Sequence, residues 1–204
     1  MFAEAAQLIR SQNEILSQLD SKCGDGDHGT TMMRAMEALE NAIGASPTEQ
    51  DLSETLRQAG WSVMGVDGGA SSALLGSFIT GMGETELGGA IDCPALAKSL
   101  GTGLQSVQKR TKAGPGDKTM MDALVPAVGV FGAAAATGKS ISGAMNDAAA
   151  AAEAGAASTK DLVARYGRAK YLGEKTLGCP DAGATSMALL FRGFSVALAA
   201  VKES

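Results

Sequence analysis

Three aspartates lie close together near the start of this 204-residue chain. Asp20, Asp25 and Asp27 are spaced D-x4-D-x-D, at the C-terminal end of an expected helix and in the glycine-rich turn that follows. A helix C-terminus already carries partial negative charge, so three carboxylates there are costly unless a cation neutralises them. Oxygen ligands suit Mg²⁺, which proteins usually share with substrate phosphates. The pattern predicts a magnesium site, with a solvated acidic turn as the alternative.

The residues after these aspartates favour an anion beside the cation. The next helix is expected to begin at Thr30 or Thr31, and the free amides at a helix N-terminus bind phosphates. His28 is the only histidine of the chain and has acidic neighbours. We expect it to pack or hydrogen-bond near a nucleotide, and no catalytic triad is visible. Carboxylates for a metal beside amides for a phosphate indicate Mg-nucleotide binding.

The same stretch also matches two other motifs, which we reject. Residues 24–29 spell G-x-G-x-x-G, but a dinucleotide-binding turn follows a buried strand. Here a helix precedes the turn, and Asp25 and Asp27 would repel a pyrophosphate. A calcium-binding EF-hand loop needs an oxygen ligand at its fifth position and glutamate at its twelfth. Those positions hold Gly29 and Met36.

A third motif, in residues 132–140, resembles a phosphate-binding P-loop. The P-loop has four residues between its glycines, whereas GAAAATGKS has five and follows a helix. We expect instead that Gly138 ends one helix and that Ser140 caps the next.

Three further glycine-bearing clusters precede or contain expected helix starts; they span residues 65–76, 114–124 and 167–186. Amides around Ala70 and Ser71 would cradle a phosphate, although a serine-capped helix explains the same residues. Met120 fits either an adenine pocket or the core. Arg168 fits either a phosphate contact or a surface salt bridge.

The composition indicates a soluble globular chain. The net charge is −5, which argues against nucleic acid or an anionic membrane as the main partner. The two most apolar segments are interrupted by Pro126 and Arg192, so no run reaches the roughly 18 apolar residues of a membrane span. An odd number of cysteines, three, indicates reduced thiols and a cytoplasmic protein.

Apolar residues recur with helical spacing along the whole chain. Leu8, Ile15 and Leu19 form one stripe with Ile9 and Leu16 beside them, and similar patterns follow up to the C-terminus. A further helix is expected in the segment STKDLVARYGRAKYL. Alternating strand patterns are essentially absent. We therefore expect about eight helices in one all-α domain that covers residues 1–204.

Four segments, in this order, resemble the nucleotide-binding subunit or domain of dihydroxyacetone kinases, the DhaL (Dak2) family. They are LDSKCGDGDHGTTM, GGASSALLG, GPGDKTMMDAL and GRAKYLGEKTLGCPDAGATS. The resemblance covers about residues 16–190. It implies a single-domain antiparallel eight-helix barrel with Mg-ADP or Mg-ATP bound at one end.

The resemblance also assigns roles to residues. Asp20, Asp25 and Asp27 would hold two Mg²⁺ ions. The residues expected to contact the nucleotide are His28, Gly29, Thr30, Thr31, Ala70, Ser71, Thr111, Met120, Arg168, Asp181, Ala182 and Gly183. The family often has Asn at Thr31, Gly at Thr111 and Pro at Ala182, which leaves the adenine contact at Thr111 open.

The function implied by the resemblance is kinase activity shared between two proteins. This chain would transfer a phosphoryl group from Mg-nucleotide to dihydroxyacetone or a related short ketose, such as erythrulose, and the ketose would be held covalently by a histidine of a DhaK-type sugar-binding subunit. Either ADP would stay bound as a coenzyme that a phosphotransferase-system protein rephosphorylates, or exchangeable ATP would be the donor. A non-catalytic nucleotide-binding adaptor is the alternative of another class, and a homodimer is compatible with the sequence.

Overall fold

The computed structural model describes residues 1–201, and in this range the chain forms helices and no strands. Nine α-helices and two 3₁₀ helices follow one another in the described range. They are α1 (Phe2–Ser11), α2 (Asn13–Ser21), α3 (His28–Ala45), α4 (Leu52–Met64), α5 (Gly69–Met82), α6 (Cys93–Gln108), α7 (Met121–Ala136), α8 (Ile141–Ser158), η1 (Thr159–Asp161), η2 (Arg168–Thr176) and α9 (Ala182–Ala200).

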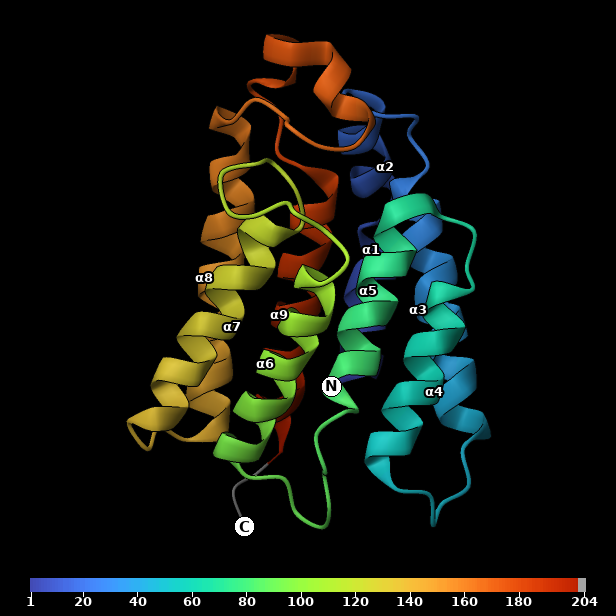
Figure 1. Cartoon of the computed structure of the whole chain (residues 1–204), viewed down its shortest axis with the longest axis vertical. Coiled ribbons are helices and arrows are strands. Elements are labelled where there is room, and N and C mark those ends of the chain that lie inside the picture. Colours follow the sequence, from blue (N-terminus) through green and yellow to red (C-terminus); the bar gives the residue numbers. More distant parts are fainter. Residues whose placement is uncertain (202–204) are drawn as a thin grey trace.

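Eight of the α-helices form a closed ring. Each packs against the next in the order α1, α3, α4, α5, α6, α7, α8, α9, and α9 packs back against α1. Neighbouring helices run in opposite directions (Figure 1). The short helix α2 packs on α3 and α9 instead of joining the ring. The antiparallel eight-helix barrel implied by the resemblance is thereby confirmed.

The alternation of directions gathers one kind of helix end at one end of the barrel. The N-termini of α3, α5, α7 and α9 all lie at the upper end in Figure 1, where η1 and η2 also lie. Each helix N-terminus carries partial positive charge and unpaired amides. The four glycine-bearing clusters singled out in the sequence are the connections that lead into these four helices.

Small residues let the helices approach closely around an aromatic core. Phe78, Phe191 and Phe194 are fully buried. The ring of Phe191 lies between those of Phe78 and Phe194 and packs against both. On α9, a Cβ added at Gly193 would lie 2.3 Å from the Cα of Ala5 on α1. Such a contact excludes any larger residue, which explains part of the high glycine content.

Some local predictions were wrong. The N-terminal stripe is divided between two helices, because the chain bends at Gln12 (φ −111°, ψ 11°), and Ile15 is exposed. Helix α3 begins at His28, two or three residues before the predicted start. The helix expected over residues 158–172 is replaced by η1, an irregular segment and η2. The residue before η2, Gly167, has a positive φ of 65°.

The interpretation of residues 132–140 as a helix end and a cap is confirmed. Gly138 has a positive φ of 75°. Glycine is the residue that most readily adopts this left-handed conformation at the end of a helix. The Ser140 side chain accepts a hydrogen bond from the amide of Gly143 and caps α8.

Helix α9 is long and apolar enough to cross a membrane by length and composition alone. It runs without interruption through Arg192, whose guanidinium pairs with Glu153 on α8. More than half of the most apolar window of α9, 56%, is buried inside the barrel. Its apolar residues, including Phe191 and Phe194, therefore serve as core.

Candidate functional site

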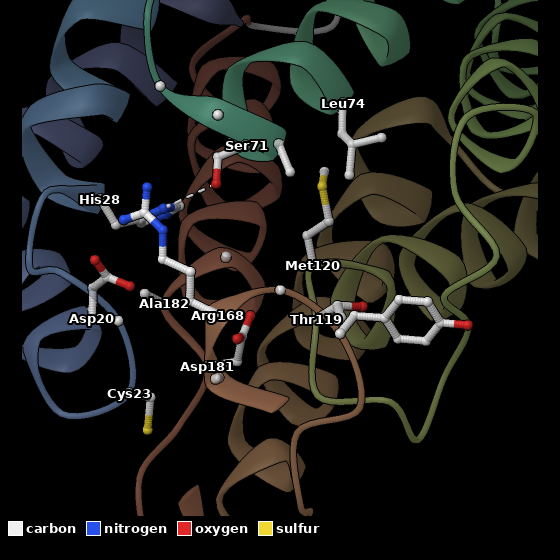
Figure 2. A pocket seen from close by; sticks show the side chains of 18 of the residues that line it. Asp20, Cys23, His28, Ser71, Leu74, Thr119, Met120, Arg168, Asp181 and Ala182 are labelled. Carbon is white, nitrogen blue, oxygen red and sulfur yellow. Dashed lines mark hydrogen bonds between the residues drawn. The ribbon is translucent and has the colours of Figure 1, made fainter. Parts of the chain in front are cut away.

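A cavity of about 570 Å³ opens at the end of the barrel where the four helix N-termini meet. It is lined by the connections into α3, α5, α7 and α9 and by the start of η2 (Figure 2). Of the residues predicted from the sequence, those that line it are Asp20, Asp25, Asp27, His28, Ala70, Ser71, Thr111, Met120, Arg168, Asp181, Ala182 and Gly183. Segments far apart in the sequence thus contribute to a single site.

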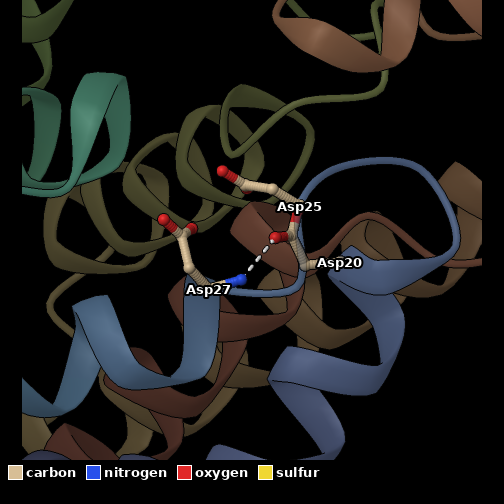
Figure 3. A group of neighbouring side chains, drawn as sticks. All are labelled: Asp20, Asp25 and Asp27. Carbon is tan, nitrogen blue, oxygen red and sulfur yellow. Dashed lines mark hydrogen bonds between the residues drawn. The ribbon is translucent and has the colours of Figure 1, made fainter.

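The three predicted metal ligands lie together at one side of this cavity (Figure 3). Asp20 is in the last turn of α2, Asp25 is in the loop, and Asp27 is the N-cap residue of α3. One carboxylate oxygen from each lies within 4.8 Å of the others. Three carboxylates at this separation repel one another, and a cation between them would remove that repulsion.

The Asp20 carboxylate also builds the loop. Its Oδ2 accepts hydrogen bonds from the amides of Gly26 (2.8 Å) and Asp27 (3.1 Å). Gly26 has φ 80°, and a Cβ added at Gly24 would lie 2.3 Å from Asp20 Oδ1. Glycine is therefore required at both positions for the chain to turn back onto Asp20.

Each aspartate keeps an oxygen that makes no bond within the described part of the chain. Asp20 Oδ1 is such an atom, and Asp27 makes no capping bond although it occupies the N-cap position. Asp25 uses Oδ2 in an ion pair with Arg168. The donor set is therefore all oxygen and partly unengaged, which fits a hard divalent cation.

Two of the four helix N-termini at the cavity have first amides that no side chain of the described residues engages. At α3 and α5 the N-cap residues are Asp27 and Gly68, and neither accepts a bond from its own helix. At α9, by contrast, Asp181 accepts a 2.7 Å bond from the amide of Ala184. At α7, the N-cap residue Met120 makes no cap, but the amide of Met121 donates a 3.2 Å bond to Thr119 Oγ1. The open amides of α3 and α5 are therefore the ones suited to bind an anion.

His28 ties three of the pocket helices together. Its Nε2 lies 3.1 Å from Ser186 Oγ on α9, and its Nδ1 lies 3.3 Å from Ser71 Oγ on α5 (Figure 2). The Ser186 hydroxyl donates its hydrogen to the carbonyl of Gly183, so Ser186 Oγ accepts a bond from Nε2–H of His28. The Ser71 hydroxyl then donates to the unprotonated Nδ1. Burial lowers the pKa of His28, which favours this neutral tautomer. These contacts hold α3, α5 and α9 together at the cavity.

One side of the cavity is apolar. Leu74 on α5 and Met120 before α7 line it together with Ala113 (Figure 2). The hydroxyl of Thr111 accepts a 3.1 Å bond from the amide of Ala113 and so is engaged within its own loop. Gly183 lies close to Met120, since an added Cβ would be 3.5 Å from the Met120 nitrogen. This side has the character of a slot for a flat apolar group such as a purine.

Three of the predicted contact residues do not line the cavity with their side chains. Gly29 faces α2, where an added Cβ would lie 1.9 Å from the carbonyl oxygen of Asn13. Thr30 is exposed. Thr31 is buried against Gly68, whose added Cβ would lie 2.2 Å from Thr31 Cγ2. Only backbone groups of Gly29 and Thr30 remain suited to ligand contact, whereas Thr31 sets the spacing between α3 and α5.

Arg168 connects η2 to the carboxylate loop. Its guanidinium pairs with Asp25, while most of its side chain, 69%, stays exposed. Of the two alternatives left open by the sequence, the salt bridge is present. The same position at the rim also places the guanidinium beside the cavity.

A buried lysine is the site feature that the sequence did not identify as functional. Lys118 is 3% exposed and has φ 58°. Its Nζ donates to the carbonyls of Thr159 and Cys179, so it joins the α6–α7 connection to the turn before α9. Lysine is normally exposed, and no sequence signal would have indicated this clamp. Other pocket residues not identified from the sequence are Cys23, Arg34, Asp67, Thr119 and Tyr166.

Asp181 lies next to this clamp and is half-buried. Burial raises its pKa from 3.8 to about 6, against the opposing effects of the Ala184 amide and the Lys118 charge. The carboxylate therefore caps α9 at an energetic cost near neutral pH.

Comparison with known proteins places this geometry in a family. The model of the DAK2 domain matches residues 22–196. The chain belongs to the DAK2 family. Within it, the chain is 36% identical over 183 residues to the PEP-dependent dihydroxyacetone kinase 1, ADP-binding subunit DhaL, of Listeria innocua, and the match covers 90% of this chain and 86% of that subunit.

Longer DAK2 proteins are similar as well. The chain is 36% identical over 179 residues to the triokinase/FMN cyclase of Rattus norvegicus, covering 88% of this chain and 31% of that protein. The crystal structure of the dihydroxyacetone kinase from C. freundii in complex with AMP-PNP and Mg²⁺ superposes with a TM-score of 0.72 at 28% identity, covering 96% of this chain and 33% of that chain. This chain thus corresponds to about a third of these longer DAK2 proteins.

The pKa of Asp181 gives a prediction for this DAK2 chain. Because the folded-state pKa of about 6 lies above 3.8, ionised Asp181 costs stability that is regained as the pH falls below 6. Asp181→Asn keeps the capping oxygen without the charge. We compare the free energy of unfolding of the ligand-free mutant with that of wild type at two pH values. The gain of the mutant over wild type should be about 2 kcal/mol larger at pH 7.5 than at pH 4.

Urea titrations of both proteins at the two pH values measure this difference. Asp92→Asn is the matched control, since Asp92 caps α6 in the same way but is exposed. An equal effect of Asp181→Asn at both pH values would show that burial does not hold the carboxyl near neutrality.

Proposed function

We propose that this chain is the nucleotide-binding subunit of a dihydroxyacetone kinase, which transfers a phosphoryl group to dihydroxyacetone or a related short ketose. The observation that carries the proposal is the placement of three partly unengaged carboxylates beside two uncapped helix N-termini in one cavity. Carboxylates that hold a cation and amides that hold phosphates are what phosphoryl transfer requires of a protein, since it depends on positioning and charge neutralisation.

The nucleotide would lie across the cavity with its phosphates towards α3 and α5. The uncapped amides of these helices would bind phosphate oxygens, and the apolar side formed by Leu74 and Met120 would take the adenine. The chain is similar to an ADP-binding subunit and to a kinase solved with AMP-PNP and Mg²⁺. This similarity supports an adenine nucleotide as the ligand. ADP or ATP is therefore the proposed nucleotide.

Asp20, Asp25 and Asp27 would hold the cation, and we propose two Mg²⁺ ions. Their oxygen-only donor set and their mutual separation fit magnesium. Three carboxylates offer more oxygens than one magnesium ion usually takes from protein, which favours two ions. When bound, magnesium would supply neutralisation of the phosphate charge during transfer. The Arg168 guanidinium, which pairs with Asp25, would lie at the rim beside the same phosphates.

The acceptor ketose is proposed to be held by a second protein, a DhaK-type sugar-binding subunit. Covalent attachment of a ketose through histidine is not available to this chain. Its single histidine, His28, is buried and both ring nitrogens contact serine hydroxyls. The cavity would then present the nucleotide to an acceptor brought from outside.

For the donor, we propose ATP that forms in place when a phosphotransferase-system protein rephosphorylates ADP that stays bound. The similarity to a PEP-dependent subunit over 86% of its length supports this mode. Exchangeable ATP is the second candidate, favoured by the equal identity to triokinase, a longer protein. The two candidates place the same demands on this cavity and differ in what delivers the phosphoryl group.

The metal assignment predicts the effect of removing one ligand. Asp25→Ala should weaken binding of Mg-ADP by at least about 100-fold and remove the Mg²⁺ dependence of ADP binding. Isothermal titration of ADP with and without Mg²⁺ measures both. Asp147→Ala, which loses an exposed ion pair with Lys139 outside the cavity, should bind as wild type. Wild-type affinity of Asp25→Ala would refute the metal assignment.

Reconstitution tests the proposed activity and the donor together. With the cognate sugar-binding subunit, Mg²⁺ and dihydroxyacetone, triose phosphate should form when a phosphotransferase-system donor is supplied and not when ATP alone is supplied. Turnover with ATP alone would select the ATP-dependent kinase. No turnover with either donor, in protein that binds Mg-ADP, would contradict the kinase and favour a nucleotide-binding adaptor.

A further inference from the structure

Two of the three free cysteines lie near the carboxylate loop: Cys23 lines the nucleotide cavity, and Cys179 packs against the last turn of α2. Cys23 lies in the carboxylate loop between Asp20 and Asp25, and Cys179 lies in the turn that leads to Asp181. The third, Cys93, begins α6 at the opposite end of the barrel (Figure 1). The fold therefore brings one pair of thiols together across the site and keeps the remaining thiol away from it.

The two thiols share the last turn of α2. Cys179 Sγ lies 3.8 Å from the carbonyl oxygen of Leu19, and the Cys23 amide donates a 2.9 Å bond to the next carbonyl along, that of Asp20. Burial raises the pKa of the Cys23 thiol, and the neighbouring Cys179 side chain raises it further, so the two side chains lie near each other.

The two members of the pair differ in exposure and in mobility. Cys23 is partly exposed and lines the cavity, whereas Cys179 is 5% exposed. The backbone at Cys179 is held by the Lys118 ammonium, and the Asp181 amide that follows donates a 2.8 Å bond to Thr159 Oγ1. The Cys23 loop, in contrast, contains two glycines. Cys23 is the thiol that a reagent reaches, and its loop is the part that yields.

We propose that Cys23 and Cys179 form a redox modification site that controls the metal loop. A low-molecular-weight disulfide is the oxidant. The Cys23 thiolate attacks one of its sulfurs, forms a mixed disulfide and releases one small thiol. The Cys179 thiolate then attacks Cys23 Sγ, closes the Cys23–Cys179 bond and releases the second small thiol. The two thiol protons leave with the two small thiols, so the protein is oxidised and the reagent is reduced.

The cross-link would act on the carboxylates. Sulfur atoms in a covalent bond are closer than sulfur atoms in contact, and the Cys179 turn is fixed, so the Cys23 loop moves. The hydrogen bonds from Gly26 and Asp27 to Asp20 hold that loop, and moving it changes how Asp20, Asp25 and Asp27 face a shared cation. Disturbing the supports of metal ligands typically weakens binding by about 10–100-fold. This inference rests on the proposed function, because it concerns regulation of the same site.

The experiment uses the full chain with all three cysteines, treated with oxidised glutathione and analysed by mass spectrometry of the intact protein and of its peptides. Wild type should lose two hydrogen atoms and yield a Cys23–Cys179 peptide pair. Cys179→Ser should stop at a glutathione adduct on Cys23, and Cys93→Ser should behave as wild type. The purified cross-linked form should bind Mg-ADP about 10–100-fold more weakly than the reduced form, and dithiothreitol should restore binding.

Bound ligand should in turn oppose the cross-link. Because coupling between two equilibria is reciprocal, Mg-ADP added before oxidation should lower the yield of cross-linked protein.

Two results would overturn the inference separately. Wild type that ends as a glutathione adduct or keeps free thiols, like Cys179→Ser, would show that the pair does not close. A cross-linked form that binds Mg-ADP as the reduced form does would show that closure does not control the loop. If the reduced protein itself fails to bind Mg-ADP, the proposed function fails together with the regulation, and the mass spectra still decide whether the cross-link forms.

Discussion

An antiparallel ring of helices must place every second N-terminus at the same end, and the site depends on this constraint. Here the N-termini of α3, α5, α7 and α9 converge on one cavity. The chain engages two of them with its own side chains, through Thr119 at α7 and Asp181 at α9. The two left open, at α3 and α5, adjoin the carboxylate loop, so positive helix ends and negative side chains face a common space. Such a space suits a ligand that carries both phosphates and cations.

The carboxylate loop is shaped by Asp20, the first of the three proposed metal ligands. Asp20 accepts bonds from the amides of Gly26 and Asp27, and it can do so only because Gly24 and Gly26 lack side chains. The same residue would therefore supply an oxygen to the proposed cation, and it fixes the positions of the other two aspartates. In this proposal cation binding and the shape of the loop are linked, so a cross-link at Cys23 would affect the metal site.

Much of the fold and site could be predicted because it is encoded locally. The D-x4-D-x-D spacing places three carboxylates in one turn, and Gly138 with Ser140 marks a helix end and a cap. What could not be predicted depends on contacts between distant segments. The 158–172 segment has helical spacing but is held in irregular form by partners such as Lys118 and Asp117, the latter accepting from the Arg165 amide. The burial of Lys118 itself and the packing of Thr31 against Gly68 likewise appear only when the ring closes.

The central claim is that the three aspartates hold cations shared with nucleotide phosphates. The most direct test is a crystal structure of the protein with a non-hydrolysable ATP analogue and Mn²⁺ in place of Mg²⁺, in which anomalous scattering locates the metal. We expect two anomalous peaks at bonding distance from carboxylate oxygens of Asp20, Asp25 and Asp27 and from the phosphates, with those phosphates at the N-termini of α3 and α5. A bound nucleotide whose metal touches none of these aspartates would contradict it.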